Sequence, residues 1–417
     1  MIDWIRTNRE KLADILFFLA YGIYLTVNII NVSFVMSVLS WTAFKIILAF
    51  CMGLILVREA LVPRLDKKSI LVFLGAAVFC IYMWDLKIWY IPAAFMIVSA
   101  RDILFDRIAR LTIWISLISV AVIAFCAEMG WITNVISITG DRIRDYLGFR
   151  YALFASNILC NVTFLCVYLW KDKINWWGFA GILLANFVIY YMTDSRIALI
   201  LALLALGMSV LMKFRPGIFY YHRGIRKAMS WSYVVWAIVG IPLMMLYTSR
   251  SKLWIKFDEL LSFRVSFPAK AYHKVGFHLL PDKDFVMIGG GLDLDGSLYS
   301  NAYNYIDNLY LQILLLYGII LLVLYLVLNT AIMRKLVDRE PRGYLLMLFS
   351  MLALQAFIQD SWWFLWYNTF LFVVVDVWWN KETAEELPPL PPRPAKQPKA
   401  RSEEELLIEK IALEARR

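Results

Sequence analysis

Apolar runs of about 20 residues recur along most of the chain, and short polar segments separate them. A helix of that length crosses a hydrocarbon core of roughly 30 Å, so the pattern predicts about twelve transmembrane helices. The expected fold class is an all-α polytopic membrane protein. The candidate spans are residues 13–32, 41–61, 69–85, 88–101, 111–130, 151–170, 175–193, 196–213, 230–248, 309–333, 343–359 and 361–379.

The same pattern divides the chain into four parts. Residues 1–248 hold the first nine spans, residues 249–308 form one large polar loop, and residues 309–380 hold the last three spans. Residues 381–417 form a Pro-rich tail that contains an extended polyproline segment at 387–394. A capping-box pattern at Ser402 and Glu405 opens a short amphipathic helix there, and a poorly ordered tail is the alternative.

Composition agrees with a membrane protein and excludes several kinds of site. The chain is 61% hydrophobic and 18% charged, with a mean hydropathy of +0.66. Its five cysteines all fall in apolar segments and lack metal-ligand spacing, which argues against disulfides and zinc. Phosphate-loop, HExxH and Rossmann patterns do not occur. We therefore expect no metal, no cofactor and no nucleic-acid partner.

The distribution of basic residues predicts which loops share a side of the membrane. Loops at 33–40, 190–194 and 360–361 are almost free of Lys and Arg, whereas the alternate loops are rich in them. The positive-inside rule then places both termini in the cytoplasm. A retained first span is expected rather than a cleaved signal peptide, because no small-residue cleavage site follows it.

Two loops on the predicted external side break this bias. One spans residues 131–150 and contains Arg144 and Arg150, and the other is the 249–308 loop with Arg250 and Arg264. Arg196 also lies at the predicted external mouth of its helix, where an unpaired arginine is costly. These cations suggest a function, although long loops can cross the membrane regardless of their charge.

Clustered arginines at a membrane surface suit a lipid that carries a pyrophosphate. Guanidinium groups bind phosphate through two hydrogen bonds and stabilise charge on a leaving pyrophosphate. Asp307 is placed to act as general base, with Asp282, Asp293 and Asp295 as alternatives. Nearby aromatic residues either stack on sugars or belong to the ordinary interfacial belt; they include Tyr299, Tyr303 and Tyr310.

Three short motifs resemble one known family. They are Asp307-Asn308-Leu309-Tyr310 with a downstream Gly318-Ile319, Asp194-Ser195-Arg196 at a helix mouth, and the segment from Arg144 through Arg150 to Asn157. In their order along the chain and in the side of the membrane on which they are predicted to lie, these motifs resemble the signatures of Wzy-type polysaccharide polymerases and O-antigen ligases. The resemblance covers roughly residues 140–360.

This resemblance implies a GT-C-like, metal-independent glycosyltransferase in the bacterial cytoplasmic membrane. Such an enzyme joins oligosaccharide repeat units carried on undecaprenyl pyrophosphate at the outer face. Carried over to this chain, Arg196 and Arg264 (or Arg250) hold the pyrophosphate, Arg150 assists and Asp307 is the base. Further substrate-binding candidates are Arg144, Asn308, Tyr303 and Tyr310. A chain-length regulator and a flippase are candidate partners.

Two alternatives keep the same substrate. The ligase branch of the family transfers the glycan to another acceptor, but it has histidine where this chain has Asp307, which favours the polymerase. A flippase for lipid-linked oligosaccharides would need charged residues inside the bundle, where the predicted spans are nearly bare of them. A membrane scaffold without enzymatic activity would not require arginines at a helix mouth.

Overall fold

The computed structural model describes residues 2–63, 67–83, 90–139, 142–171, 173–261, 263–281, 285–298 and 303–379. The tail at 381–417, Asp282 and Tyr299 lie outside these residues, so the predictions made for them are not addressed by the structure.

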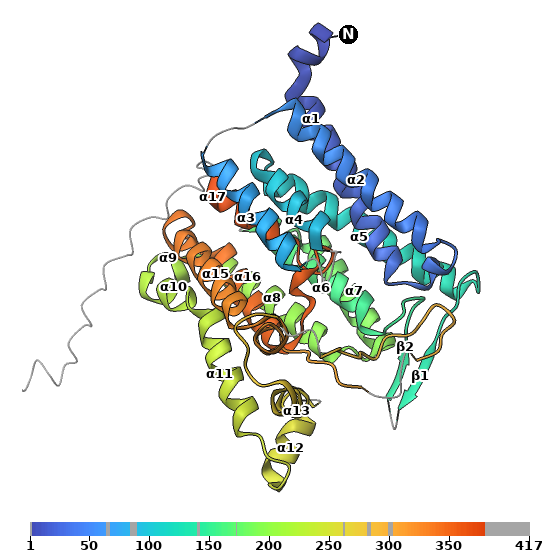
Figure 1. The fold of residues 1–417 in the computed structure, drawn as a ribbon. Helices are drawn as coiled ribbons and strands as arrows, with labels where there is room; N and C mark the ends of the chain where they lie inside the picture. The colour runs from blue at the N-terminus through green and yellow to red at the C-terminus, as the bar shows by residue number, and fades with distance from the viewer. Residues whose placement is uncertain are drawn as a thin grey trace, which may run out of the picture.

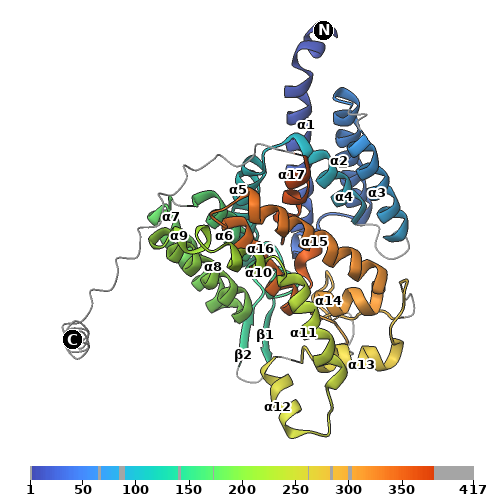
Figure 2. The same ribbon diagram turned by 90° about the vertical axis from the view of Figure 1, so that its left-hand side faces the viewer.

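The described chain is mostly helical (Figures 1 and 2). Its first half holds α1 (Ile2–Asn31), α2 (Trp41–Leu61), α3 (Lys67–Met83), α4 (Tyr90–Ser99), α5 (Phe105–Glu128), α6 (Leu153–Trp170), α7 (Trp176–Thr193) and α8 (Arg196–Phe214). Its second half holds α9 (Gly217–Tyr220), α10 (Arg223–Met229), α11 (Ser232–Leu246), α12 (Lys252–Leu260), α13 (Ser266–Val275), α14 (Leu309–Gln312), α15 (Ile319–Arg339), α16 (Tyr344–Ile358) and α17 (Val373–Trp379). One antiparallel hairpin pairs β1 (Ile136–Thr139) with β2 (Arg142–Asp145).

Six of the described helices are long and apolar enough to cross a membrane, namely α1, α5, α6, α7, α8 and α15. The bent pair of α10 and α11, with a 45° angle between them, would make a seventh. The all-α fold with membrane-type helices is thus confirmed, whereas a total of about twelve spans stays a prediction. The predicted span at 361–379 is not one helix, because η4 (Ser361–Trp363), η5 (Thr369–Phe372) and α17 divide it.

The loops that the charge pattern assigns to one side meet at one end of the bundle. We call it the hairpin end, because β1 and β2 lie there together with α12 and α13 (Figures 1 and 2). The backbone N–H of Arg150 donates to the carbonyl of Val32 at 3.1 Å, and that of Phe34 donates to Gly148 at 2.8 Å. The link from α1 and the segment after the hairpin therefore form one layer over the helix ends.

Basic residues at the opposite end bind the helices to one another. Arg101 contacts Glu59 at 2.6 Å, and Arg58, only 2% exposed, pairs with the same carboxylate. Arg226 donates to four backbone carbonyls, those of Phe219, Tyr220, Val337 and Pro341. These arginines lie in loops that the charge pattern assigns to the cytoplasmic side, and their described contacts join helices and loops of the bundle to one another.

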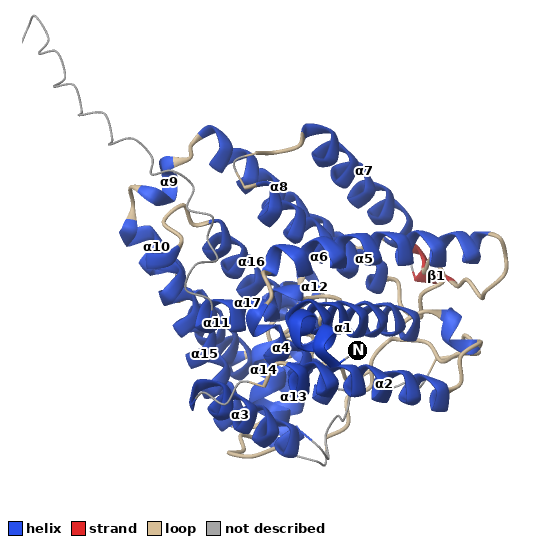
Figure 3. Ribbon diagram, turned by 90° about the horizontal axis from the view of Figure 1, so that it is seen from above, coloured by secondary structure: helices blue, strands red, loops and turns tan. Residues whose placement is uncertain are grey.

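Polar side chains join helices inside the bundle. Helix α6 is the most enclosed of the six candidate spans, since 78% of the residues in its apolar stretch are buried inside the bundle. Helix α7 lies at the periphery, and only 17% of the residues in its apolar stretch are buried (Figure 3). The Asn161 amide on α6 donates to Thr369 Oγ1 at 2.8 Å and accepts the Thr369 N–H at 3.2 Å. In hydrocarbon such bonds hold helices together where apolar contacts alone give little preference.

The predicted span at 309–333 is interrupted at Gly318. Helix α14 continues into one π-helical turn, η3 (Ile313–Tyr317), and Gly318 then takes φ +90° before α15 begins. The first amides of α15 donate to the loop, with Ile319 N 2.8 Å from His278 O and Ile320 N 3.3 Å from Leu279 O. The large loop thus supplies acceptors to helix amides that have none within the helix.

Candidate functional site

Asp307 lies at the hairpin end, immediately before α14. Asn308 is the N-cap of that helix, and its Oδ1 accepts the Leu311 N–H at 3.1 Å. The Tyr310 hydroxyl donates to the Ala353 carbonyl on α16 at 2.9 Å. Both side chains are buried, and these contacts fix the backbone that carries Asp307. Asn308 and Tyr310 thus hold this helix in place, and their predicted role in substrate binding stays a prediction.

Arg264 is the cation nearest to Asp307, with Nη2 lying 3.9 Å from Oδ2. Its Nε donates to the Ile358 carbonyl at 2.8 Å, and Nη1 donates to the Leu261 carbonyl at 3.1 Å. The turn that carries it is fixed by Asp258, whose Oδ1 accepts the N–H groups of Val265 and Ser266. Arg264 is therefore oriented by the backbone, not by its ion pair alone.

The surroundings of Asp307 raise its proton affinity. Burial raises the pKa of Asp307 to about 6, and the nearby Asp360 carboxylate adds to the rise. The Arg264 guanidinium and a hydrogen bond with Tyr303 act in the opposite direction on the same pKa. The side chain still has 27% of its surface exposed, so a ligand can reach it. A carboxylate whose pKa lies near the working pH is well suited to general-base chemistry.

Asp360 is a functional candidate that the sequence interpretation missed. It follows α16, and its Oδ2 accepts a hydrogen bond from Gln312 Nε2 at 2.9 Å and another from the Tyr305 hydroxyl. These bonds keep a second negative charge close to Asp307. The sequence signal for Asp360 is a lone acidic residue in the short polar break between two apolar runs.

Arg144 belongs to the surroundings of Asp307. It lies on β2, and its buried Nε has no hydrogen-bond partner in the described part of the chain. Its charge acts on Tyr151: burial and Asp307 raise the pKa of that phenol, whereas Arg144 and Arg264 lower it. Tyr151 therefore lies within electrostatic reach of both arginines and of Asp307.

Arg150 lies beside this group rather than against Asp307. Its carbonyl accepts the Leu292 N–H at 2.8 Å, which binds the segment after the hairpin to the large loop. Its guanidinium interacts electrostatically with Tyr367, which in turn interacts with Asp360. The backbone of Arg150 therefore joins the two loops that broke the predicted charge bias.

A run of three glycines brings the large loop against aromatic rings. A Cβ at Gly289 would lie 3.1 Å from the Tyr305 ring, and one at Gly290 would lie 3.3 Å from Tyr151. The rings of Tyr303 and Tyr305 have their centroids 6.5 Å apart. Small residues at 289–291 thus allow the backbone to approach the tyrosines beside Asp307.

Arg196 belongs to a different ionic group. Its Nε lies 3.1 Å from Asp194 Oδ1, and Arg142 of β2 pairs with the same carboxylate and donates to the Asp194 carbonyl at 3.0 Å. Both arginines lower the pKa of Asp194 against the opposing effect of burial. Arg196 is 63% exposed, and among the described side chains neither Arg196 nor Arg250 contacts Asp307. Arg142 is a member of this ionic group to which the sequence pattern assigned no role.

The alternative bases do not share the environment of Asp307. Asp293, which is partly buried, and Asp295, which is exposed, lie in one turn, in which Asp295 accepts the Ser297 N–H at 2.8 Å and Asp293 accepts the Leu294 N–H at 2.7 Å. Hydrogen bonds from Ser297 lower the pKa of Asp295. Within the described residues, no group of three or more His, Cys, Asp or Glu side chains is placed to hold a metal ion.

Comparison with models of known protein families, with curated proteins and with solved structures finds no significant match.

Proposed function

We propose that the protein is a metal-independent membrane glycosyltransferase that polymerises oligosaccharide repeat units carried on undecaprenyl pyrophosphate. The observation that carries the proposal is the Arg264–Asp307 pair, in which a carboxylate of pKa about 6 lies beside a backbone-fixed guanidinium. A base and a phosphate-binding cation side by side are what glycosyl transfer from a lipid pyrophosphate requires.

In the proposed reaction, Asp307 accepts the proton of the attacking hydroxyl on the acceptor repeat unit. That oxygen forms a bond to the anomeric carbon of the growing chain, while the bond from that carbon to the pyrophosphate oxygen breaks. The lipid pyrophosphate leaves with the electron pair. Arg264 and Arg144 stabilise its negative charge, because guanidinium groups stay charged and bind phosphate through paired N–H donors.

The proposal places the hairpin end outside the cytoplasm, in a GT-C-like arrangement of about twelve spans with both termini in the cytoplasm. Support comes from the loop at 33–40, which is almost free of basic residues and is hydrogen-bonded to the segment after the hairpin at that end. The arginines at the opposite end follow the positive-inside rule. A bacterial cytoplasmic membrane, with a flippase and a chain-length regulator as partners, completes the proposal.

The test uses the full chain in proteoliposomes supplied with an undecaprenyl-pyrophosphate-linked repeat unit. We expect a ladder of products from the wild type and none from Asp307→Asn. Asp295→Asn is the matched control, since this aspartate lies in an exposed turn. A ladder of normal yield from Asp307→Asn would refute the base assignment. Transfer of a single repeat unit to a different acceptor, without a ladder, would instead indicate the ligase alternative.

A further inference from the structure

Helix α12 exposes apolar side chains at the hairpin end, beyond the end of α11 (Figures 1 and 2). Leu253 is 79% exposed, and Phe257, four residues later, is 37% exposed. Side chains four residues apart lie on the same face of a helix. A neighbouring face carries Lys252, Lys256 and Glu259, all of them exposed. Helix α12 is therefore amphipathic, and its apolar face is not buried in the bundle.

Helix α12 meets the rest of the protein through a third face. Asp258 is 2% exposed, and its Oδ1 accepts the N–H groups of Val265 and Ser266 at 2.9 and 3.0 Å. Trp254, one turn before Asp258, is half-buried. The helix thus has a face packed on protein, an exposed apolar face and an exposed charged face. A helix lying where protein, lipid and water meet requires these three faces, whereas a helix surrounded by water has no need of the apolar one.

The apolar face of α12 continues the exposed apolar surface of α11. Val235 and Leu246 of α11 are both exposed, and they lie about three turns apart on one face. Because α11 belongs to the bent pair that can cross a membrane, lipid covers this face. Aromatic rings lead from there into α12, since the ring of Trp254 lies 6.1 Å from that of Tyr247 and 6.0 Å from that of Phe257. Tyr and Trp are enriched at the boundary between lipid and water.

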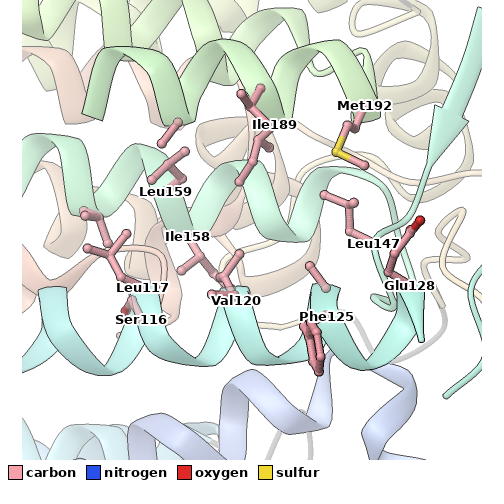
Figure 4. A pocket seen from close by; sticks show the side chains of 15 residues that line it. Ser116, Leu117, Val120, Phe125, Glu128, Leu147, Ile158, Leu159, Ile189 and Met192 are labelled. Atoms are coloured by element: carbon pink, nitrogen blue, oxygen red, sulfur yellow. The ribbon is translucent and has the colours of Figure 1, made fainter. Parts of the chain in front are cut away.

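A second apolar surface marks where this boundary lies on the bundle. A groove between α5, α6 and α7 is lined by apolar side chains as far as Glu128, the last residue of α5 (Figure 4). Among the described residues that line the groove, Glu128 alone is ionisable. A carboxylate near the end of a membrane helix reaches the interface. The edge of the hydrocarbon therefore lies at the hairpin end, where α12 is also found (Figure 1).

The charge and the length of α12 also suit a lipid surface. Lys252 and Lys256 lie beside the apolar face, and lysine side chains extend from such positions to the phosphates of lipid head groups. The helix has nine residues, fewer than the roughly 12–15 that an isolated helix needs in water. Insertion of its apolar face about 5–10 Å into the head-group boundary would supply the missing stabilisation.

We infer that α12 lies on the lipid surface at the hairpin end, inserts Leu253 and Phe257 among the lipid chains, and thereby anchors the turn that carries Arg264. The anchoring runs through Asp258, which holds that turn from the opposite side of the helix. The lipid contact does not depend on the proposed function. The anchoring deepens that function, because it ties the Arg264–Asp307 pair to the membrane.

The first experiment measures the depth of the apolar face by electron paramagnetic resonance on the full chain in phosphatidylcholine nanodiscs. A nitroxide is attached through a ketone-bearing unnatural amino acid at position 253, since the chain has five cysteines of its own. Position 259, exposed on the charged face of the same helix, is the matched control. Oxygen concentrates in lipid and a nickel chelate stays in water. We expect the ratio of oxygen to nickel collisions to be several-fold higher at position 253 than at position 259.

The second experiment tests the anchoring by hydrogen–deuterium exchange in the same nanodiscs. Leu253→Gln combined with Phe257→Gln makes the apolar face polar. Lys256→Gln combined with Glu259→Gln is the control, because it changes two exposed positions of the same helix without altering the net charge. We expect the two amides that donate to Asp258 to exchange several-fold faster in the first variant and at the wild-type rate in the control.

The outcomes separate this inference from the proposed function. Equal collision ratios at positions 253 and 259 would overturn the lipid contact. A label at 253 shielded from both reagents would also overturn it, since protein would then cover this face. A label in lipid with unchanged exchange in the Leu253→Gln, Phe257→Gln variant would overturn the anchoring. A label in lipid on a wild-type protein that forms no ladder would instead refute the proposed function and leave the lipid contact in place.

Discussion

The guanidinium of Arg264 donates to the backbone carbonyls of Ile358 and Leu261 while its Nη2 lies 3.9 Å from the Asp307 carboxylate. Its position therefore does not depend on the ion pair. A substitution at Asp307 should leave the cation in place, so the base and the phosphate-binding group can be tested separately. The predictions below use this independence.

Wild-type turnover should rise with pH and level off above about 6, because Asp307 must lose its proton before it can accept one from the acceptor. Burial raises the pKa of this carboxyl to about 6, so the protonated, inactive form predominates below that pH. The check is the initial rate of ladder formation across acidic and neutral pH. A rate already at its plateau near pH 4 would contradict the assignment.

Arg264→Gln should move the midpoint of that pH profile upward. The guanidinium lowers the pKa of Asp307, so without its charge the carboxyl holds its proton to higher pH. We also expect a rate loss of about 10²–10³-fold at the plateau, as for other groups that stabilise transition-state charge. A lower rate with an unmoved midpoint would show that Arg264 does not act on Asp307.

Asp360→Asn should move the midpoint downward, opposite to the effect of Arg264→Gln. The Asp360 charge raises the pKa of Asp307, and the amide removes that charge while its oxygen can still accept from Tyr305 and Gln312. The measurement is the same pH profile. A merely structural Asp360 would change the yield of folded protein without shifting the midpoint.

The family resemblance assigns Arg196 to pyrophosphate binding, although it lies apart from Asp307; on that assignment Arg196→Ala should abolish polymer formation while the protein still inserts and accumulates. An exposed ion pair such as that of Arg196 with Asp194 contributes only about 0–1 kcal/mol to stability, so little folding free energy is at stake. Arg142→Ala is the comparison, because it removes the other partner of Asp194. Membrane fractions are assayed for protein and for polymer, and wild-type polymer in Arg196→Ala would exclude a role in pyrophosphate binding.

Gly318→Ala should lower the free energy of unfolding by more than about 2 kcal/mol, since a left-handed backbone and a steric conflict both oppose a side chain there. A Cβ at Gly318, where φ is +90°, would lie 2.5 Å from the Leu279 carbonyl oxygen. Gly207→Ala is the control, because a Cβ at that helical glycine meets nothing within 4 Å. Melting temperatures in detergent compare the two, and equal values would contradict the described break.

The hydrophobic pattern predicted the helices well where each one crosses the bundle unbroken. The predicted span at 41–61 matches α2 exactly in its bounds, and that at 175–193 matches α7 to one residue. The pattern failed at 309–333 and 361–379, because hydropathy averages over a window and does not register a single turn. The positive φ of Gly318 interrupts the helix in the 309–333 segment. In the 361–379 segment, Thr369 is hydrogen-bonded to Asn161 of α6 and lies in a short 3-10 turn, not in a continuous α-helix.

The sequence singled out Asp307 and Arg264 as candidate residues, but it could not predict which side chains the fold brings together. Asp307 and Arg264 are distant in sequence, and their pairing depends on the turn that Asp258 fixes. Charge bias singled out the two loops, yet it could not show that Arg196 and Arg142 both pair with Asp194 instead. The sequence did not predict a role for Asp360, because Gln312 and Tyr305, which donate hydrogen bonds to its carboxylate, lie beside it only in the folded chain.

The dependence of α15 on His278 and Leu279 has a consequence for proteolysis. The amides of Ile319 and Ile320 take their acceptors from the large loop, and a peptide group without an acceptor costs several kcal/mol in hydrocarbon. Cleavage of the loop that freed His278 and Leu279 would therefore destabilise α15 as well as the loop. It would strip the beginning of a membrane helix of its hydrogen bonds, so an intact loop is a condition for the bundle itself.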